Sequence, residues 1–388
     1  MMRSDFRYYA AFELPGGGHI GDVPLDPDWI PALRWAEFEQ DVVNDCMPGN
    51  RSVRPTVVPV WSSQANRPYV GGVSICRSEE GDDAVGFPLT YFSAAVIAAS
   101  GELVASGALV AGQRFDYKVF ALPDTQGQRP PDPAIKVVAI AERPAVECTN
   151  MAPFVAAARS HAGGAAVPDS LSSPSDSTAM PIFVPQQALN EATELAQGAG
   201  DVETGGVLVG KLCRGSEGQL FCRVTAQIPA RHTTATRQSL RFTPDTWVNV
   251  DAAIKLRGRG EVAIGWWHSH PWFCVKCAPQ QRAICPFSSP AFSAADRHLH
   301  REVFQTSWSI ALLLSFLGDE RPSYDVFAWN KGQIQAVDFY TLPESGAISG
   351  ESPCQMKIPL VHAARADPMG CSCKTRTVVP TRDDFWPA

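Results

Sequence analysis

The chain has 388 residues, of which 45 % are hydrophobic and 19 % charged, and its formal net charge is −7 at pH 7. This length predicts two domains, and the mixed charges predict a soluble globular protein. The acidic balance and the lack of a Lys/Arg run argue against a nucleic-acid partner. The longest apolar runs, such as 94–99, are too short to cross a bilayer, and the first seven residues lack the apolar core of a secretion signal. We therefore expect a cytoplasmic protein with no membrane partner.

Residues 1–158 predict a small α+β domain, with a role in recognition or partner binding. Aromatic and β-branched runs predict strands at residues 6–14, 57–61, 69–76, 103–111, 117–122 and 135–140. Apolar positions three and four apart predict a helix from about Pro31 to Val43, which Asp28 could help to cap. Gly16–Gly18 predict a flexible turn rather than a phosphate-binding loop, because no Gly-Lys-Ser/Thr follows.

The composition changes abruptly after that region. Gly, Ser, Pro and Asp dominate the stretch that follows, which predicts a linker at residues 159–179. Beyond it we expect helices at residues 186–197, 244–256 and 293–304, and strands at residues 181–185, 206–210, 220–228, 262–267, 308–314, 325–329 and 334–338. Interleaved strands and helices predict a layered α/β domain at 180–342, and an irregular tail follows at 343–388.

Two histidines stand where the apolar run Val262–Ile264 leads into Gly-Trp-Trp-His-Ser-His-Pro. Residues two apart on a strand point to the same side, so His268 and His270 can face one metal ion. Asp296, in the first turn of a predicted helix, could supply a third ligand. Two imidazoles and one carboxylate leave the fourth position of tetrahedral Zn²⁺ open for water, which is the catalytic arrangement. Glu203, just before a glycine pair, is a candidate general base.

Taken alone, a His-x-His pair is as often two ordinary histidines near a strand end. The wider pattern favours the metal site. Glu203, His268-Ser-His-Pro271 and Ser293-Ala-Ala-Asp296, in that order, resemble the signature of the JAMM (MPN⁺) metalloprotease family over roughly residues 180–342.

The resemblance implies an α/β/α sandwich with a mixed sheet and a zinc-dependent isopeptidase that removes ubiquitin or ubiquitin-like proteins from lysine side chains. It implies that His268, His270 and Asp296 bind zinc, that Glu203 activates water, and that Ser293 stabilises the oxyanion. The sequence departs from the family in its spacing, because twenty-five residues separate His270 from Asp296, more than is usual there.

The extra segment, residues 272–290, lies beside the predicted cleft and contains Cys274, Cys277 and Cys285. Cys-x₂-Cys is a good ligand spacing, so these thiols predict a second, structural zinc ion whose fourth ligand could be Cys213, Cys371, Cys373 or a histidine. Reduced free thiols and a redox disulfide are the alternatives. Trp272 and Phe273 could line a channel for the substrate's extended tail.

The expected function is therefore zinc-dependent cleavage after the C-terminus of a ubiquitin-like protein. The expected partners are that protein, its conjugates, and activating-like or conjugating-like enzymes, and the extra domain favours a bacterial origin. One alternative is a protease that processes a ubiquitin-like or sulfur-carrier precursor, and another is a non-catalytic scaffold. A nucleoside deaminase is rejected, because no His/Cys-x-Glu precedes a Pro-Cys-x₂-Cys motif.

Overall fold

The computed structural model describes the chain in segments, and the account below concerns these alone. They are residues 3–4, 6–43, 55–62, 69–76, 84–124, 145–160, 180–231, 233–236, 239–271, 292–316 and 322–343. The fold is mixed α/β, as the sequence predicts. Within these segments, no helix is both long enough and apolar enough to span a bilayer.

The N-terminal part contains two small sheets and two α-helices. Its strands are β1 (Arg3–Ser4), β2 (Phe6–Glu13), β3 (His19–Leu25), β4 (Thr56–Trp61), β5 (Val70–Cys76), β6 (Val85–Pro88) and β7 (Asp116–Pro123). Its helices are α1 (Ile30–Phe38), the π-helix η1 (Glu39–Val43), the 3₁₀-helix η2 (Leu89–Phe92) and α2 (Ser93–Ala105). One sheet has the strand order β3-β2-β7 and the other β1-β4-β5-β6.

Most sequence predictions for this part are confirmed, but the strand predicted at residues 103–111 is wrong. Its first residues form the last turn of α2, in which Val96, Ala99 and Leu103 are buried at the spacing of a helix. The alanines of this segment have the highest helix propensity, which outweighs the short β-branched run. The predicted turn at Gly16–Gly18 is confirmed as the β2–β3 hairpin loop. The strand predicted at 135–140 lies outside the described residues, and β3 and β6 were not predicted.

The C-terminal part is built on one large mixed sheet. Its strands are β8 (Val146–Cys148), β9 (Arg159–Ser160), β10 (Ile182–Pro185), β11 (Gly205–Arg214), β12 (Leu220–Pro229), β15 (Val262–His270), β16 (Ile310–Ser315), β17 (Ser323–Asn330), β18 (Gln333–Val337) and β19 (Tyr340–Leu342). Their order is β18-β17-β16-β15-β11-β12-β10-β19-β9, and β8 pairs with β11. The helices are α3 (Ala152–Ala157), α4 (Gln186–Ala199), α5 (Pro244–Arg257) and α7 (Ala294–Val303), and β13 (Thr233–Ala235) pairs with β14 (Leu240–Phe242).

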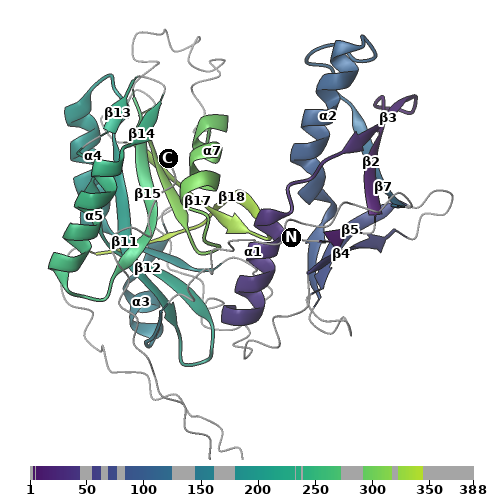
Figure 1. Cartoon of the computed structure of the whole chain (residues 1–388). Coiled ribbons are helices and arrows are strands. Elements are labelled where there is room, and N and C mark those ends of the chain that lie inside the picture. Colours follow the sequence, from purple (N-terminus) through teal and green to yellow (C-terminus); the bar gives the residue numbers. More distant parts are fainter. Residues whose placement is uncertain are drawn as a thin grey trace, which may run out of the picture. The chain divides into compact units, whose positions relative to one another are not determined.

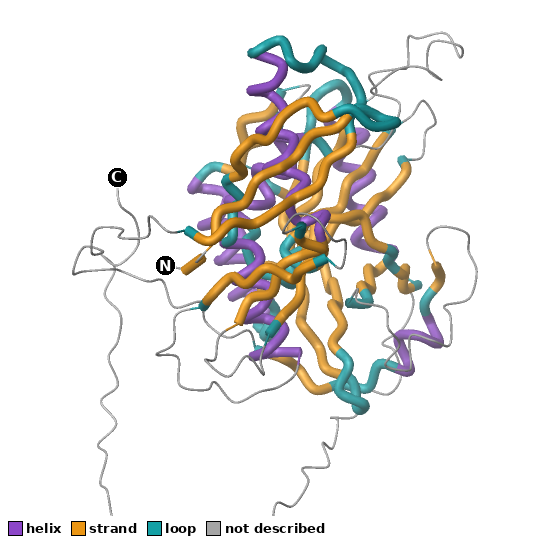
Figure 2. Tube along the Cα trace, turned by 90° about the vertical axis from the view of Figure 1, so that its right-hand side faces the viewer, coloured by secondary structure: helices purple, strands orange, loops and turns teal. Residues whose placement is uncertain are grey.

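Helices cover both faces of this sheet. On one face, Leu189 of α4 shares a core with Leu208 and Trp267. On the other face, Val250 of α5 packs with Val207, and Leu299 of α7 packs with Trp266 and its neighbours. Figure 1 shows α7 beside β15 and β17, and in Figure 2 the helices, in purple, lie against the orange strands. The result is an α/β/α arrangement, in which β15 is a central strand flanked by β11 and β16.

Residues 146–160 pair with this large sheet, although the sequence placed them in the N-terminal domain and the linker. β8 runs parallel to β11, and β9 pairs with β19. Between them, Phe154 of α3 packs on Phe183 and Phe221. The remaining linker residues, 161–179, and the tail after Pro343 lie outside the described residues.

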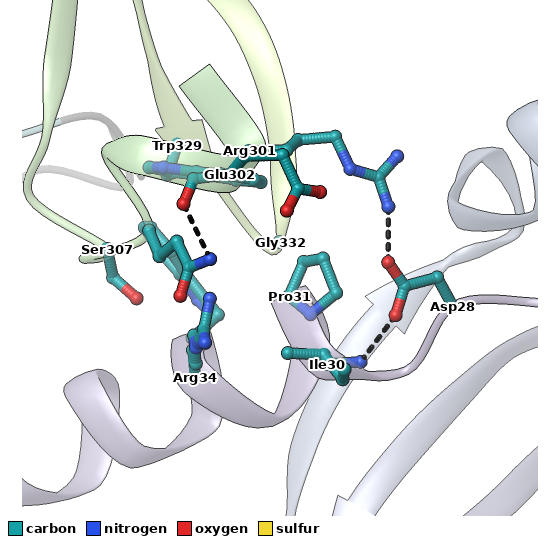
Figure 3. Close-up of a pocket in the computed structure, with 11 residues that line it drawn as sticks. Asp28, Ile30, Pro31, Arg34, Arg301, Glu302, Ser307, Trp329 and Gly332 are labelled. Atoms are coloured by element: carbon teal, nitrogen blue, oxygen red, sulfur yellow. Dashed lines mark hydrogen bonds and ion pairs between the residues drawn. The ribbon is translucent and has the colours of Figure 1, made fainter. Parts of the chain in front are cut away.

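Helix α1 also contacts the C-terminal part of the chain. Phe38 packs on Trp308 with 5.8 Å between ring centroids. Arg301 donates to Asp28, whose other carboxylate oxygen accepts the Ile30 N–H at 3.0 Å, and these groups border a cavity of about 140 Å³ (Figure 3). Asp28 thus accepts the N–H of the first residue of α1, as expected of a residue that helps to cap the helix, although the N-cap position itself is Trp29 and has no side-chain cap. This cavity is lined by residues of α1, by the C-terminal end of α7 and the residues that follow it, and by Trp329 and Gly332; it does not include the two histidines.

Candidate metal centre

His268 and His270 lie at the carboxyl end of β15, inside the large sheet. His268 pairs with Gly205 of β11 on one side and with Leu313 of β16 on the other. Gly205 permits this close pairing, because a Cβ atom there would lie 2.4 Å from the Trp267 carbonyl oxygen. The imidazole of His268 is fully buried, and that of His270 is partly exposed. One histidine is therefore held rigidly while the other borders solvent.

Asp296 completes a cluster of three metal-binding side chains. His268 Nε2 lies 3.2 Å from His270 Nε2 and 3.2 Å from Asp296 Oδ1. His270 Nε2 lies 3.5 Å from Asp296 Oδ2. Zinc binds His nitrogens and carboxylate oxygens at about 2.0–2.2 Å, so tetrahedral ligand atoms stand roughly 3.3 Å apart. The donor types and their spacing therefore fit a zinc ion, and among the described residues these three form the cluster able to hold a metal.

The electrostatics of the cluster favour the metal-binding protonation states. Burial lowers the pKa of His268 and keeps its ring neutral, although Asp296 opposes that shift. Burial alone would raise the pKa of Asp296, but hydrogen bonds from His268, His270 and Ser293 outweigh it and hold that pKa well below its usual range. A neutral imidazole and an ionised carboxylate are the forms that bind zinc.

Helix α7 fixes Asp296 through its N-terminal cap. Ser293 Oγ accepts the Asp296 N–H at 3.1 Å, and Asp296 Oδ2 accepts the Ser293 N–H at 2.7 Å. This reciprocal capping box satisfies two N–H groups at the start of the helix. The cap uses the Ser293 oxygen as an acceptor and leaves its hydroxyl hydrogen available to donate. Its predicted role at an oxyanion stays a prediction.

Glu203 lies just before β11 and is nearly buried, with 5 % of its surface exposed. Burial raises the pKa of its carboxyl to about 7; His270 opposes the shift and Asp296 adds to it. Its charge thus interacts with two of the three metal ligands, and a pKa near neutrality suits a general base. A bound divalent cation would lower this pKa by favouring the ionised form.

Three contributions to the site were not predicted from the sequence. Ser269 points away from the histidines and holds the turn beside Glu203, because its Oγ accepts the Thr204 N–H at 3.1 Å and its N–H donates to Thr204 O at 2.8 Å. Trp266 stacks on the His268 ring with 4.5 Å between centroids, and its indole N–H donates to His300 Nδ1 at 3.1 Å. Strand alternation was the available signal for Ser269, whereas the Trp266–His300 pair has no local signature.

The predicted second zinc site and substrate channel lie outside the described residues. This applies to Trp272, Phe273, Cys274, Cys277 and Cys285. Cys213, one suggested fourth ligand, is buried in a core with Phe183 and Phe221. Burial raises the pKa of its thiol to about 12, which disfavours the metal-binding thiolate.

Comparison with known proteins identifies no family. No family model matches the chain, and no curated protein matches it. Among solved structures, the solution structure of protein DSY2949 from Desulfitobacterium hafniense is similar, with 23 % identity over 42 % of this chain and 94 % of that chain. Its TM-score is 0.30, which is too low to support an argument about this protein.

Proposed function

We propose that this protein is a zinc-dependent hydrolase of amide bonds that acts on isopeptide bonds formed by a ubiquitin-like protein. The observation that carries the hydrolase proposal is the convergence of His268, His270 and Asp296, with ligand atoms 3.2–3.5 Å apart, beside the buried carboxyl of Glu203. The choice of substrate rests on the sequence resemblance to JAMM proteases.

In this mechanism the three ligands hold zinc, and the chain's own groups move the protons. When bound there, zinc would act as a Lewis acid that polarises the amide carbonyl and makes water more acidic. Glu203 accepts a proton from the attacking water and later delivers it to the departing amine. The Ser293 hydroxyl donates to the oxygen that becomes negatively charged as the carbonyl is attacked. The two products are the free C-terminal acid of the ubiquitin-like protein and the free lysine amine of the target.

The experiment compares Glu203→Gln with the wild type for zinc content and for cleavage of isopeptide-linked ubiquitin-like conjugates. Glutamine keeps the shape but cannot take a proton, so we expect zinc to stay bound and turnover to fall by about 10²–10⁴-fold. Glu217→Gln is the matched control, because Glu217 lies exposed in the turn between β11 and β12. Retained activity in Glu203→Gln would refute the role of the base.

Zinc content tests the metal site separately. A His268→Ala/His270→Ala variant should lose one zinc ion per chain relative to the wild type. A well-folded wild type that binds no zinc would favour the scaffold. Cleavage of a linear precursor in preference to an isopeptide would favour the processing protease.

A further inference from the structure

The face of the sheet that carries the histidines continues across β16 and β17. His270 pairs with Ser315, while His268 pairs with Leu313, which in turn pairs with Asp325. Paired residues of neighbouring strands point to the same face, so Ser315 and Asp325 project on the same side as the histidines. With neighbouring strands about 4.8 Å apart, the backbone of Asp325 lies roughly 10 Å from that of His268.

The packing supports this assignment of faces. Leu313 and Phe327 belong to the same buried cluster as Trp266 and Phe292, on the side covered by α7. Asp325 lies two residues before Phe327 on β17 and therefore shares its face. Both Ser315 and Asp325 thus lie beside the metal ligands at the end of the sheet where β15 finishes.

Both side chains contain a buried polar atom that has no hydrogen-bond partner among the described residues. Ser315 is 2 % exposed, and its Oγ has no hydrogen bond in the described part of the chain. Asp325 Oδ2 is likewise buried and unpartnered there. Ser323 hydrogen-bonds the backbone oxygen of Ser315 and leaves the hydroxyl unused. Because unpaired buried polar atoms are costly and rare, their retention next to a metal site needs an explanation.

Among the described residues, the Asp325 carboxylate also has no countercharge. Burial raises the pKa of its carboxyl, and none of the described cations offsets that shift. Arg297 of α7 is engaged elsewhere: it donates to Ile334 O at 3.0 Å and lies over the Phe292 ring. Asp325 is not part of the His268–His270–Asp296 cluster either, so a second metal ligand set does not account for it.

An apolar wall accompanies these acceptors. The Phe292 ring stacks on Phe327 with 4.4 Å between centroids and lies 6.2 Å from the His268 ring. Leu313 is fully buried between the His268 and Asp325 positions. A lysine side chain complements these groups. Its alkyl stem can pack on the apolar wall, and its ammonium group can donate three hydrogen bonds to the acceptors.

We propose that Ser315 and Asp325 form a subsite next to the metal triad, and that it binds the ammonium group of a lysine side chain of the substrate other than the acylated one. Asp325 supplies the countercharge and Ser315 a further hydrogen bond, while Phe292 contacts the alkyl stem. The subsite deepens the proposed function, on which its role in substrate recognition rests. Cation binding itself can be measured without catalysis.

The test measures binding of Nα-acetyl-lysine amide and its neutral isostere Nα-acetyl-norleucine amide to the full-length, zinc-loaded chain by NMR titration or calorimetry. We expect the lysine probe to bind at least about tenfold more tightly, the effect of one charge-assisted hydrogen bond. Asp325→Asn should abolish this preference and Ser315→Ala should weaken it. Asp338→Asn, at an exposed acid after β18, should leave it unchanged.

A wild type that binds both probes equally would overturn the subsite, as would an Asp325→Asn variant that keeps the preference. If that variant does not fold, the wild type still decides the matter. The lysine probe must then shift the methyl signals of Leu313 more than those of Leu189, on the opposite face.

The outcomes separate the two proposals. Asp325-dependent lysine binding without any isopeptide cleavage would keep the subsite and refute the hydrolase. Glu203-dependent cleavage that is indifferent to Asp325→Asn in KM and in probe binding would keep the hydrolase and refute the subsite.

Discussion

The indole N–H of Trp266 donates to Nδ1 of His300 at 3.1 Å, and this bond joins the two elements that carry the metal ligands. Trp266 stands two residues before His268 on β15 and stacks on its ring. His300 stands one helical turn after Asp296 on α7 and is fully buried. The contact therefore sets the separation of a strand ligand from a helix ligand.

Replacing His300 should weaken zinc binding, although its ring accepts a hydrogen bond from Trp266 and not from a metal ligand. In His300→Phe the Trp266 N–H loses its acceptor, and α7 is free to shift relative to β15. Outer contacts of this kind are typically worth about 10–100-fold in metal affinity. Zinc competition with a chelating dye would measure the change. His298→Phe is the matched control on the exposed face of α7 and should bind zinc like the wild type; equal affinity in both variants would contradict the positioning role.

The same histidine should make stability depend on pH. Burial lowers the pKa of His300 from 6.5 to about 3, so between these values the unfolded chain holds a proton that the folded chain lacks. The free energy of unfolding therefore falls as pH drops below about 6.5, by roughly 1.4 kcal/mol per pH unit from this residue. Urea unfolding at several pH values from 7.5 to 5 should show a shallower decline in His300→Phe than in the wild type. Parallel curves would show that His300 does not titrate this way.

Protonation of Glu261 gives a second pH dependence of stability, with the same sign as that of His300 but at lower pH. Its carboxylate accepts hydrogen bonds from Arg257 at 2.5 and 2.9 Å and from Thr225 at 2.6 Å, and Arg257 is the main cause that lowers the pKa of Glu261 to about 2. The folded pKa lies below the unfolded value of 4.5, so this stabilisation is complete above pH 4.5 and is lost as pH falls towards 2.

Glu261→Gln should consequently lower the free energy of unfolding by about 1–3 kcal/mol at pH 7, and the loss should shrink below pH 4. Chemical denaturation of both proteins at pH 7 and at a pH below 4 would measure this difference in the free energy of unfolding. The exposed pair Lys255–Asp251 on α5 has the same i,i+4 spacing, so Asp251→Asn is the control and should change stability by less than about 0.5 kcal/mol. A Glu261→Gln loss that is equal at both pH values would show that packing, not charge, is responsible.

Local patterns were sufficient to predict the element that carries each ligand, whereas the meeting of Asp296 with the two histidines was implied by the resemblance to the JAMM family. His268 and His270 share a face through strand alternation, and Asp296 falls in the first turn of a helix that Ser293 caps. The contact between Trp266 and His300 spans 34 residues and depends on where α7 packs, which no local pattern encodes. For the same reason the sequence could not show that residues 146–160 pair with the large sheet.

The strand wrongly predicted at 103–111 failed for a different reason. Short apolar runs fit either a strand or a helix, and the alanines preceding Leu103 favour the helix.

At the candidate metal site, the burial of side chains is what the sequence could not give. The position of Glu203 before a glycine pair makes it a candidate base, but only the burial of its carboxyl explains a pKa of about 7.

Gly205 links the fold to the metal site most directly. It pairs with His268, and a Cβ atom placed there would lie 2.4 Å from Trp267 O and 2.5 Å from Leu240 Cδ2. Gly205→Ala must therefore push β11 away from β15 and move His268 relative to Asp296. We expect a lower melting temperature and at least about tenfold weaker zinc binding, as when the groups around a metal site are misplaced.

Gly86→Ala is the matched control, because a Cβ atom in that strand position meets no atom within 4 Å. Zinc affinity and thermal unfolding measured together decide the point: if Gly205→Ala lowers the melting temperature but binds zinc normally, β11 supports the fold without positioning the ligands.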